Sequence, residues 1–128
     1  MCRVGVYVRR RCLARGCLIL LTMSLSGCGL LSDPQKKEVS IVLEASDLGD
    51  SAFSPNPVVV HFGGHIVWKN DDKLPHSIVG DAKHGVCAFK SDGIMPRGRF
   101  KKTFHRRVTC NYYCGIHGRD MRGRIIVR

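Results

Sequence analysis

The sequence predicts an all-β domain, a sandwich or a barrel, and three observations lead to this prediction. Short apolar runs with a period of two recur from Val39 onward, as in strands that bury one face. Gly, Pro, Asn and Asp recur between these runs, where turns are expected. No stretch of ten or more residues combines an apolar period of 3.6 with helix caps. Packed sheets or a closed barrel fit such a pattern.

The predicted strands follow one another at short intervals. The first two carry apolar residues at every second position: Val39, Ile41 and Leu43 in one, Val58, Val60 and Phe62 in the other. Gly63-Gly64 is a turn signal, and Ile66 and Trp68 point to one side of the next run, so residues 57–69 are predicted to form a hairpin. Further strands are expected over 77–79, 100–104, 108–114 and 123–128.

Residues 1–27 are expected to be a leader that is removed on export. Five Arg and no acid lie in residues 1–16, and an apolar run from Cys17 to about Leu25 follows. That run has nine residues, whereas a membrane-spanning helix needs roughly 20, so a permanent transmembrane helix is disfavoured. Leu25-Ser26-Gly27-Cys28 resembles the bacterial lipobox, which implies lipidation of Cys28. The predicted organisation is leader 1–27, tether 28–38 and folded domain 39–128.

The composition is that of one domain with a moderate basic excess. Of the 128 residues, 44% are hydrophobic and 24% charged, which argues against a disordered chain and against a multi-span membrane protein. The formal charge is +11, but removal of five leader Arg leaves 16 basic residues against 10 acids, a charge of +6. Three of the seven Cys also lie in the leader, so the Cys count does not indicate a disulfide scaffold.

The loop before the last predicted strand concentrates the chemistry of the chain. Cys114, His117 and Met121 place a thiol, an imidazole and a thioether within eight residues. A loop between neighbouring strands can bring them to one point, whereas a straight strand points neighbours to opposite faces. Two His and one Cys in a plane, with a weak axial Met, form a blue-copper electron-transfer site. His76, which follows a proline and opens a short apolar strand, is the candidate for the second His.

Other uses of these residues fit the sequence less well. A structural zinc site needs four ligands, usually Cys or His, and no fourth one stands at the expected spacing. A Cys nucleophile with a His base needs an orienting acid and an oxyanion loop, and neither is indicated nearby, so no enzyme is predicted. The binuclear copper site of terminal oxidases needs two Cys in the loop, and this loop has one.

From about Phe53 to Arg128 the chain resembles the cupredoxins of the plastocyanin, pseudoazurin and amicyanin type. The resemblance lies in Phe53-Ser54-Pro55, Gly63-Gly64-His65-Ile66-Val67-Trp68-Lys69-Asn70, Leu74-Pro75-His76-Ser77 and the ending Tyr-Tyr-Cys-x-x-His-x-x-x-Met-x-Gly that starts at Tyr112. It implies a Greek-key β-sandwich and one type 1 copper ion. The ligands that it implies are His76, Cys114, His117 and Met121, with His117 as the exposed gate for electrons.

One spacing and two positions depart from the family's pattern. Three residues separate His117 from Met121, between the amicyanin-like and the plastocyanin-like spacing, so the reduction potential is not carried over. Ser77 stands where several members have Asn, and Cys110 stands where a core aromatic is common. These departures concern the rigidity and tuning of the site.

The remaining Cys and His residues leave alternatives open. Cys110 shares its strand face with Cys114 and is most simply a buried free thiol, although a disulfide with Cys87 is possible in an oxidising compartment. Four further His are expected at the surface. His61 and His65 are expected on an outward strand face. His84 and His105 are expected beside loops, where these two side chains could bind a surface metal.

Six basic residues occur within eleven positions: Arg97, Arg99, Lys101, Lys102, Arg106 and Arg107. Arg119 and Arg122 flank the ligand loop. Such a run is either a solvated face or a docking surface for an acidic redox partner or anionic headgroups. Nucleic acid is disfavoured as a partner of an exported chain.

The sequence therefore predicts a monomeric, exported copper protein, lipid-anchored to a bacterial membrane, that carries single electrons between redox partners in the periplasm or at the cell surface. Two alternatives would use the same ligands. One is a copper-handling protein that sequesters copper or delivers it to a copper enzyme, and the other is an assembly factor for such an enzyme.

Overall fold

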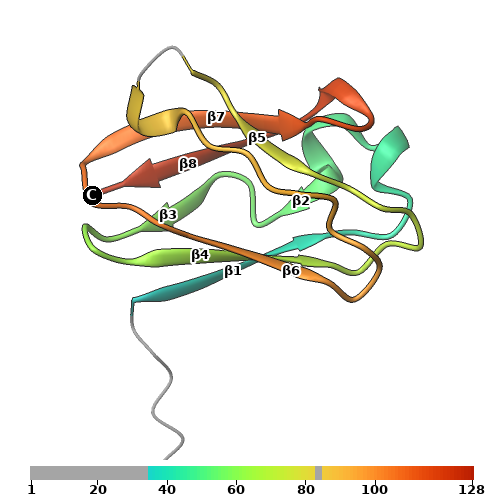
Figure 1. Ribbon diagram of the computed structural model, residues 1–128, viewed down its shortest axis with the longest axis horizontal. Coiled ribbons are helices and arrows are strands. Elements are labelled where there is room, and N and C mark those ends of the chain that lie inside the picture. The colour runs from blue at the N-terminus through green and yellow to red at the C-terminus, as the bar shows by residue number, and fades with distance from the viewer. Residues whose placement is uncertain (1–34, 83–84) are drawn as a thin grey trace, which may run out of the picture. The chain divides into compact units, whose positions relative to one another are not determined.

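Two four-stranded sheets pack face to face in the computed structural model, which describes residues 35–82 and 85–128 (Figure 1). The strands are β1 (Lys36–Ile41), β2 (Phe53–Ser54), β3 (Val58–Val60), β4 (His65–Asn70), β5 (Ile78–Gly80), β6 (Arg99–Thr103), β7 (Val108–Cys114) and β8 (Gly118–Val127). One sheet has the order β2-β1-β4-β6 and the other β3-β8-β7-β5. The prediction of an all-β sandwich is confirmed.

Three short 3-10 helices lie in the connections: η1 (Ala45–Asp47), η2 (Gly49–Ala52) and η3 (Gly85–Cys87). Ser32–Arg128 forms a compact unit of its own, which contains every described strand. The predicted leader, the lipidation site Cys28, most of the predicted tether and His84 lie outside the described residues.

The predicted start of the folded domain at Val39 is too late. β1 begins at Lys36, inside the stretch predicted to be a tether. β4 holds the first residues of β1 in the sheet, because the two strands pair in parallel from Lys36 opposite His65 to Ile41 opposite Asn70. Lys36 and Lys37 are exposed and polar, so the alternation of apolar residues did not include them.

The predicted hairpin over residues 57–69 is wrong, although both of its strands exist. β3 pairs with β8 in one sheet, whereas β4 pairs with β1 and β6 in the other. The chain crosses between the sheets through Gly63, whose φ of 79° lies in the left-handed region. The apolar side chains of both strands still face one core. Phe62, predicted to share that core, is 55% exposed because β3 ends before it.

Aromatic side chains fill the core between the sheets. The Trp68 ring centroid lies 5.5 Å from that of Tyr112 and 5.6 Å from that of Phe100. The Phe53 ring meets Tyr112 edge-on at 4.8 Å. Burial of such large side chains stabilises a fold by roughly 1.5–3 kcal/mol each. Tyr112 lies two residues before Cys114 on the same face of β7, so this packing also fixes the strand that carries Cys114.

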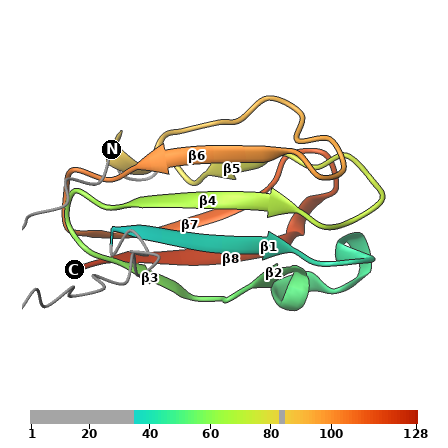
Figure 2. The same ribbon diagram turned by 90° about the horizontal axis from the view of Figure 1, so that it is seen from below.

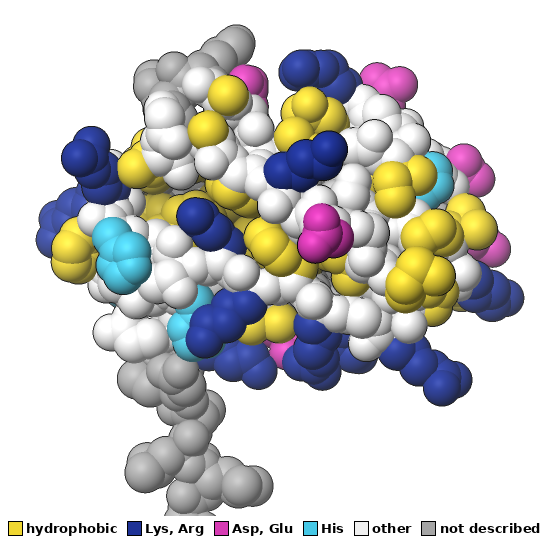
Figure 3. Space-filling view, in the orientation of Figure 1, with side chains coloured by type: hydrophobic (Ala, Val, Ile, Leu, Met, Phe, Trp, Pro, Cys, Tyr) yellow, Lys and Arg dark blue, Asp and Glu magenta, His cyan; other side chains and the backbone are white. Residues whose placement is uncertain are grey.

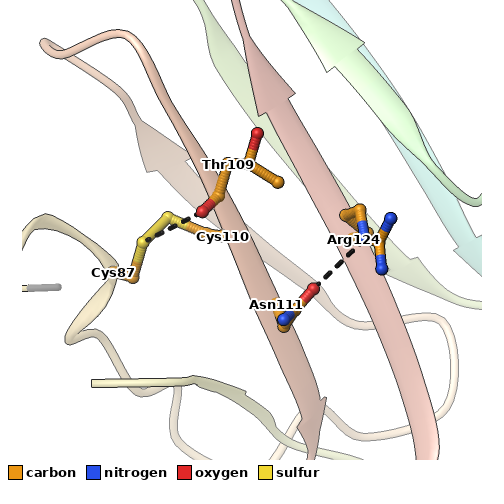
Figure 4. Close-up of a disulfide and its surroundings, with 5 residues drawn as sticks. All are labelled: Cys87, Thr109, Cys110, Asn111 and Arg124. Carbon is orange, nitrogen blue, oxygen red and sulfur yellow. Dashed lines mark hydrogen bonds between the residues drawn. A yellow bond between two sulfur atoms is a disulfide. The ribbon is translucent and has the colours of Figure 1, made fainter. Parts of the chain in front are cut away.

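A disulfide joins Cys87 of η3 to Cys110 of β7, and both residues are buried (Figure 4). The expectation that Cys110 is a free thiol is therefore wrong, and the alternative pairing is correct. Figure 4 also shows Arg124 of β8 beside Asn111, the residue after Cys110. Arg124 Nε donates to Asn111 Oδ1 at 3.3 Å. The connection after β5 is thus covalently attached to the strand that leads to the ligand loop.

The strands run between two ends of the domain, which Figures 1 and 2 show on the right and left. β1, β4 and β7 all run toward the end that carries η1, η2 and the connection from β7 to β8, which we call the site end. The starts of β1 and β4 and the last residues of β8 lie at the opposite end, which we call the distal end.

Candidate metal centre

Backbone hydrogen bonds hold His76 rigidly at the site end. Its N–H donates to the Ile94 carbonyl at 3.1 Å, and its own carbonyl accepts from the Ile94 N–H at 2.6 Å. The residue before it is Pro75, whose ring fixes φ. The His76 side chain is fully buried. The backbone of His76 is therefore fixed, and burial leaves its imidazole little room to move.

The connection from β7 to β8 brings two further donors to the same place. Cys114 is the last residue of β7 and lies at an irregularity in the pairing with β8, where it faces Gly118. Gly115 packs so tightly that a β-carbon there would lie 2.8 Å from Ser77 Oγ and 2.8 Å from Val79 Cγ2. Gly118 has φ of 95°, which side chains disfavour, and it lets the chain turn directly after His117.

Three side chains converge on one point in this arrangement. The Nδ1 atoms of His76 and His117 are 3.1 Å apart, and Cys114 Sγ lies 3.7 Å from the first and 3.5 Å from the second. Donor atoms bound about 2.0–2.3 Å from one ion, with angles between tetrahedral and trigonal, are about 3.3–3.8 Å apart. The two imidazoles and the thiol therefore fit a metal ion with little rearrangement.

These three residues are the only group of three or more His, Cys, Asp or Glu with metal-binding spacing in the parts of the chain that the structure describes. Met121, the fourth predicted ligand, is the first buried residue of β8 and is 1% exposed. It follows Gly118, the partner of Cys114, by three residues. The structure thus brings three predicted ligands together and puts the fourth in the core on β8, beside the strand that ends at Cys114.

Sequence reasoning missed Asp72, which lies behind His76. Asp72 Oδ2 is 2.9 Å from His76 Nε2, on the side of the ring opposite Nδ1. Asp72 is only 5% exposed. Its carboxylate also accepts from the backbone N–H groups of Glu44 (3.0 Å), Ala45 (3.2 Å) and Lys73 (2.7 Å). When Nε2 donates to Asp72, Nδ1 of the neutral ring is left as the acceptor that a metal needs.

The surroundings of Cys114 favour its thiolate form. Burial raises the pKa of the thiol. The contact with His76 and the backbone N–H groups of Ser77, His117 and Ile116 lower it by more than burial raises it, so the pKa falls from 9.0 to about 6. Metals bind the thiolate, so a lowered pKa reduces competition from protons near neutral pH.

Asp72 and His76 shift each other's pKa in the directions expected of an ion pair. Burial opposes ionisation of Asp72, but hydrogen bonds from His76 and from backbone N–H groups lower its pKa from 3.8 to about 2. Burial lowers the pKa of His76, but the contacts with Cys114 and Asp72 outweigh this and raise it. Asp72 is therefore a carboxylate at neutral pH.

The surface around the ligand loop is apolar. Figure 3 shows hydrophobic side chains gathered over the site end, on the right of that view. Five exposed large apolar residues belong to segments at this end: Leu43, Leu48, Leu74, Met95 and Ile116. His117 is partly exposed among them. The candidate centre is therefore buried except along one imidazole edge.

The other three histidines that the structure describes take no part in this centre. His61, His65 and His105 lie at the distal end, close to the start of β4 and the end of β6. The prediction that His61 and His65 are outward-facing and solvated holds for His61, which is exposed, whereas His65 is partly buried.

No family model matches the chain. Among curated proteins it is 30% identical to the chloroplastic plastocyanin of Fritillaria agrestis over 99 residues, which cover 70% of this chain and 59% of that protein, so the chain spans little more than half of its length. It is 33% identical to the plastocyanin of Vicia faba over 99 residues, 70% of this chain and 99% of the relative. The solved structure of a purple cupredoxin from Nitrosopumilus maritimus aligns at 26% identity with a TM-score of 0.64, over 71% of this chain and 98% of that one.

Proposed function

The chain belongs to the cupredoxin family, and from that premise we propose that it carries single electrons between redox partners through one type 1 copper ion. The ligands we propose are His76, Cys114, His117 and Met121. The observation that supports this most directly is the convergence of the first three donor atoms within 3.1 to 3.7 Å. When bound, copper would supply the one-electron couple. No catalysis on a substrate is part of this function.

The protein's part in electron transfer is to keep the ligands still. Electron transfer is slow when geometry must change with oxidation state, and two His, one Cys and a weak Met suit both states of copper. His76 is fixed by Ile94 on its backbone and by Asp72 on its ring. The fit of Gly115 against Ser77 fixes the loop that carries Cys114 and His117. The site is therefore preorganised, and burial of three ligands excludes water from it.

The same burial favours electron transfer over copper delivery. A protein that hands copper to another must expose its ligands to the recipient, whereas His76, Cys114 and Met121 are at most 1% exposed. Only the partly exposed His117 reaches the surface, which suits passage of an electron better than exchange of an ion. Copper handling remains the alternative to test against.

We propose export, with a lipid on Cys28 as the anchor. The disulfide between Cys87 and Cys110 supports an oxidising compartment, where such bonds persist. None of the helices in residues 35–82 and 85–128 has the length and apolarity to cross a membrane. The basic leader and the lipobox-like sequence before Cys28 supply the remaining support. The membrane is proposed to be bacterial, with the domain in the periplasm or outside the cell.

A monomer is proposed to dock its redox partner at the site end. The apolar rim around His117 provides close contact, and basic residues at that end, including Arg97 and Arg119, suit an acidic partner surface. Such charges speed encounter and lose effect as salt rises.

The test of the proposed function is a visible absorption and EPR spectrum after addition of Cu(II) to residues 32–128, with Cys114→Ala alongside. We expect an intense thiolate-to-copper band with narrow copper hyperfine splitting, and neither feature in the variant. A reversible redox couple separates a carrier from a copper-handling protein, which would instead lose Cu(I) readily to a competing chelator. A blue Cys114→Ala protein would contradict the ligand assignment.

A further inference from the structure

The basic run at 97–107 does not form one surface. Arg97 lies at the site end, where its N–H donates to the Asn70 carbonyl at 2.8 Å. Arg106 and Arg107 lie at the distal end, on the connection from β6 to β7. The seven residues of β7 separate them from Cys114 by roughly 20 Å, which exceeds two Debye lengths of about 8 Å at physiological salt. Arg106 and Arg107 therefore contribute little to docking over the ligand loop.

Backbone hydrogen bonds gather three segments at the distal end. The His65 N–H donates to the Gln35 carbonyl at 2.8 Å, and Gly63 and Gly64 exchange bonds of 2.9 and 3.0 Å with Phe104. These segments carry the side chains that we call the distal basic surface: Lys36, Lys37, His61, Phe62, His65, His105, Arg106 and Arg107. Figure 3 shows Lys, Arg and His side chains over this end, on the left of that view.

No acidic residue belongs to these three described segments, 35–37, 61–65 and 104–107. The next acid along β1 is Glu38, which pairs with Lys36 at 3.4 Å and with Arg99 at 3.2 Å. Lys37, Arg106 and Arg107 are exposed. The distal end therefore presents concentrated positive charge with little internal compensation, a pattern that fits an anionic partner.

Phe62 adds an apolar contact to this charge. Its side chain is 55% exposed, and its backbone is fixed by a 2.8 Å hydrogen bond to the Arg128 carbonyl. An exposed aromatic ring among Lys and Arg side chains is typical of surfaces that lie in the headgroup region of a bilayer, where the ring meets acyl chains and the cations meet phosphate.

We propose that the distal basic surface lies against anionic lipid headgroups, so that the domain stands on the membrane with His117 directed away from it. This inference rests on the proposed anchor at Cys28, which precedes Gln35 by seven residues. Seven residues extend to at most about 25 Å, so the lipid would hold the start of β1 near the membrane. β1 starts at the distal end, so the chain enters the folded domain on the side that carries the basic surface.

A domain that is already anchored at Cys28 needs only a low affinity for the headgroups. Each Lys or Arg near an anionic surface strengthens binding by about fivefold. A tether raises the effective concentration of the domain at the surface, so a weak contact suffices to set orientation. The orientation leaves the apolar rim around His117 free for a partner.

Vesicle flotation of residues 32–128, a compact unit without the anchor, tests the inference. The probes are vesicles of phosphatidylcholine alone and of phosphatidylcholine mixed with phosphatidylglycerol. We expect binding to the anionic vesicles that weakens with salt, and none to the neutral ones. Arg106→Gln with Arg107→Gln removes two cations and is expected to weaken binding roughly 25-fold. Phe62→Ser is expected to weaken it further.

The matched control removes the same charge from the other end. Lys90 and Arg97 are both exposed and belong to the half of the domain that holds the ligand loop, so Lys90→Gln with Arg97→Gln is expected to retain binding. An equal loss in the control would overturn the inference, since net charge alone would explain it. Failure to bind anionic vesicles even at low salt, where the contact between charges is least screened, would also overturn it and would direct the search to an acidic protein.

The outcome is separable from that of the proposed function. The copper spectrum of the same samples reports on the metal site, and the mass of the membrane-bound full chain reports on lipidation of Cys28. A blue protein that does not bind anionic vesicles would contradict only the proposed orientation of the domain on the membrane. A colourless protein that binds them would contradict only the copper assignment.

Discussion

Asp72 Oδ2 lies 2.9 Å from His76 Nε2, and both side chains are almost completely buried. The ring thus joins a carboxylate on one side to the candidate metal position on the other. Asp72 is itself held by three backbone N–H groups, two of them from the segment after β1. A negative charge is therefore fixed one imidazole away from the candidate metal position.

Replacement of Asp72 is expected to weaken the copper site and to raise its reduction potential. Asp72→Asn removes a negative charge that favours Cu(II) over Cu(I), and it loosens the orientation of His76. Loss of such a supporting group lowers metal affinity by about 10- to 100-fold. Competition with a chelator and voltammetry measure the two effects. Asp71→Asn is the matched control, because Asp71 is exposed and bonds to Ser40 and Lys69. An unchanged potential in Asp72→Asn would contradict this role.

The thiol of Cys114 is expected to ionise with a midpoint near pH 6 in the metal-free protein. Its pKa is lowered from 9.0 to about 6, so the proton leaves as pH rises through 6 rather than through 9. Thiolate absorbance in the ultraviolet gives the midpoint for residues 32–128, in which Cys87 and Cys110 do not titrate because they are bonded to each other. Cys114→Ser should show no step, and a midpoint that stays near 9 would contradict the prediction.

Removal of the disulfide is expected to lower the free energy of unfolding by about 3 kcal/mol, because a link across 23 residues restricts the unfolded chain. Cys87→Ala with Cys110→Ala, compared with the parent by urea unfolding, measures the loss. The copper spectrum should survive, since neither sulfur belongs to the group of converging donors. Addition of a reductant should destabilise the parent and leave the double variant unchanged.

A methyl group at Gly115 is expected to displace the ligand loop. The new β-carbon would lie 2.8 Å from both Ser77 Oγ and Val79 Cγ2, closer than such atoms approach. Gly115→Ala should therefore weaken copper binding and broaden the EPR spectrum. Gly93→Ala is the control, because nothing lies within 4 Å of a β-carbon at Gly93. Equal spectra for the two variants would show that the loop has more room than this packing implies.

The sequence predicts the class of fold and the donor set because both depend on local signals. Alternation marks the faces of β3 and β4, and a thiol, an imidazole and a thioether in one loop indicate copper whatever the sheet order. Strand partners are different, since alternation tells which face is buried and not which strand lies alongside. That is why β3 and β4 were expected to pair, although they lie in separate sheets.

Asp72 escaped prediction, and the disulfide was only an alternative to a free Cys110 thiol, for a similar reason. Asp72 stands in Asn70-Asp71-Asp72-Lys73, a polar stretch typical of an exposed turn, and nothing local distinguishes the buried acid from its exposed neighbour Asp71. An acid four residues before a candidate ligand His was the one available signal. Cys87 and Cys110 are 23 residues apart, and their meeting depends on how the connection after β5 folds back onto β7.

The position of β8 determines when, during folding, the sheet closes and the candidate metal site is completed. β8 follows every other strand in the chain, yet it lies between β3 and β7 in its sheet and carries Met121. A polypeptide that has emerged only as far as the ligand loop therefore has two unjoined strands and no closed core. The four proposed ligands therefore come together only after β8 has inserted, so a chain exported unfolded would complete its proposed metal site on the far side of the membrane.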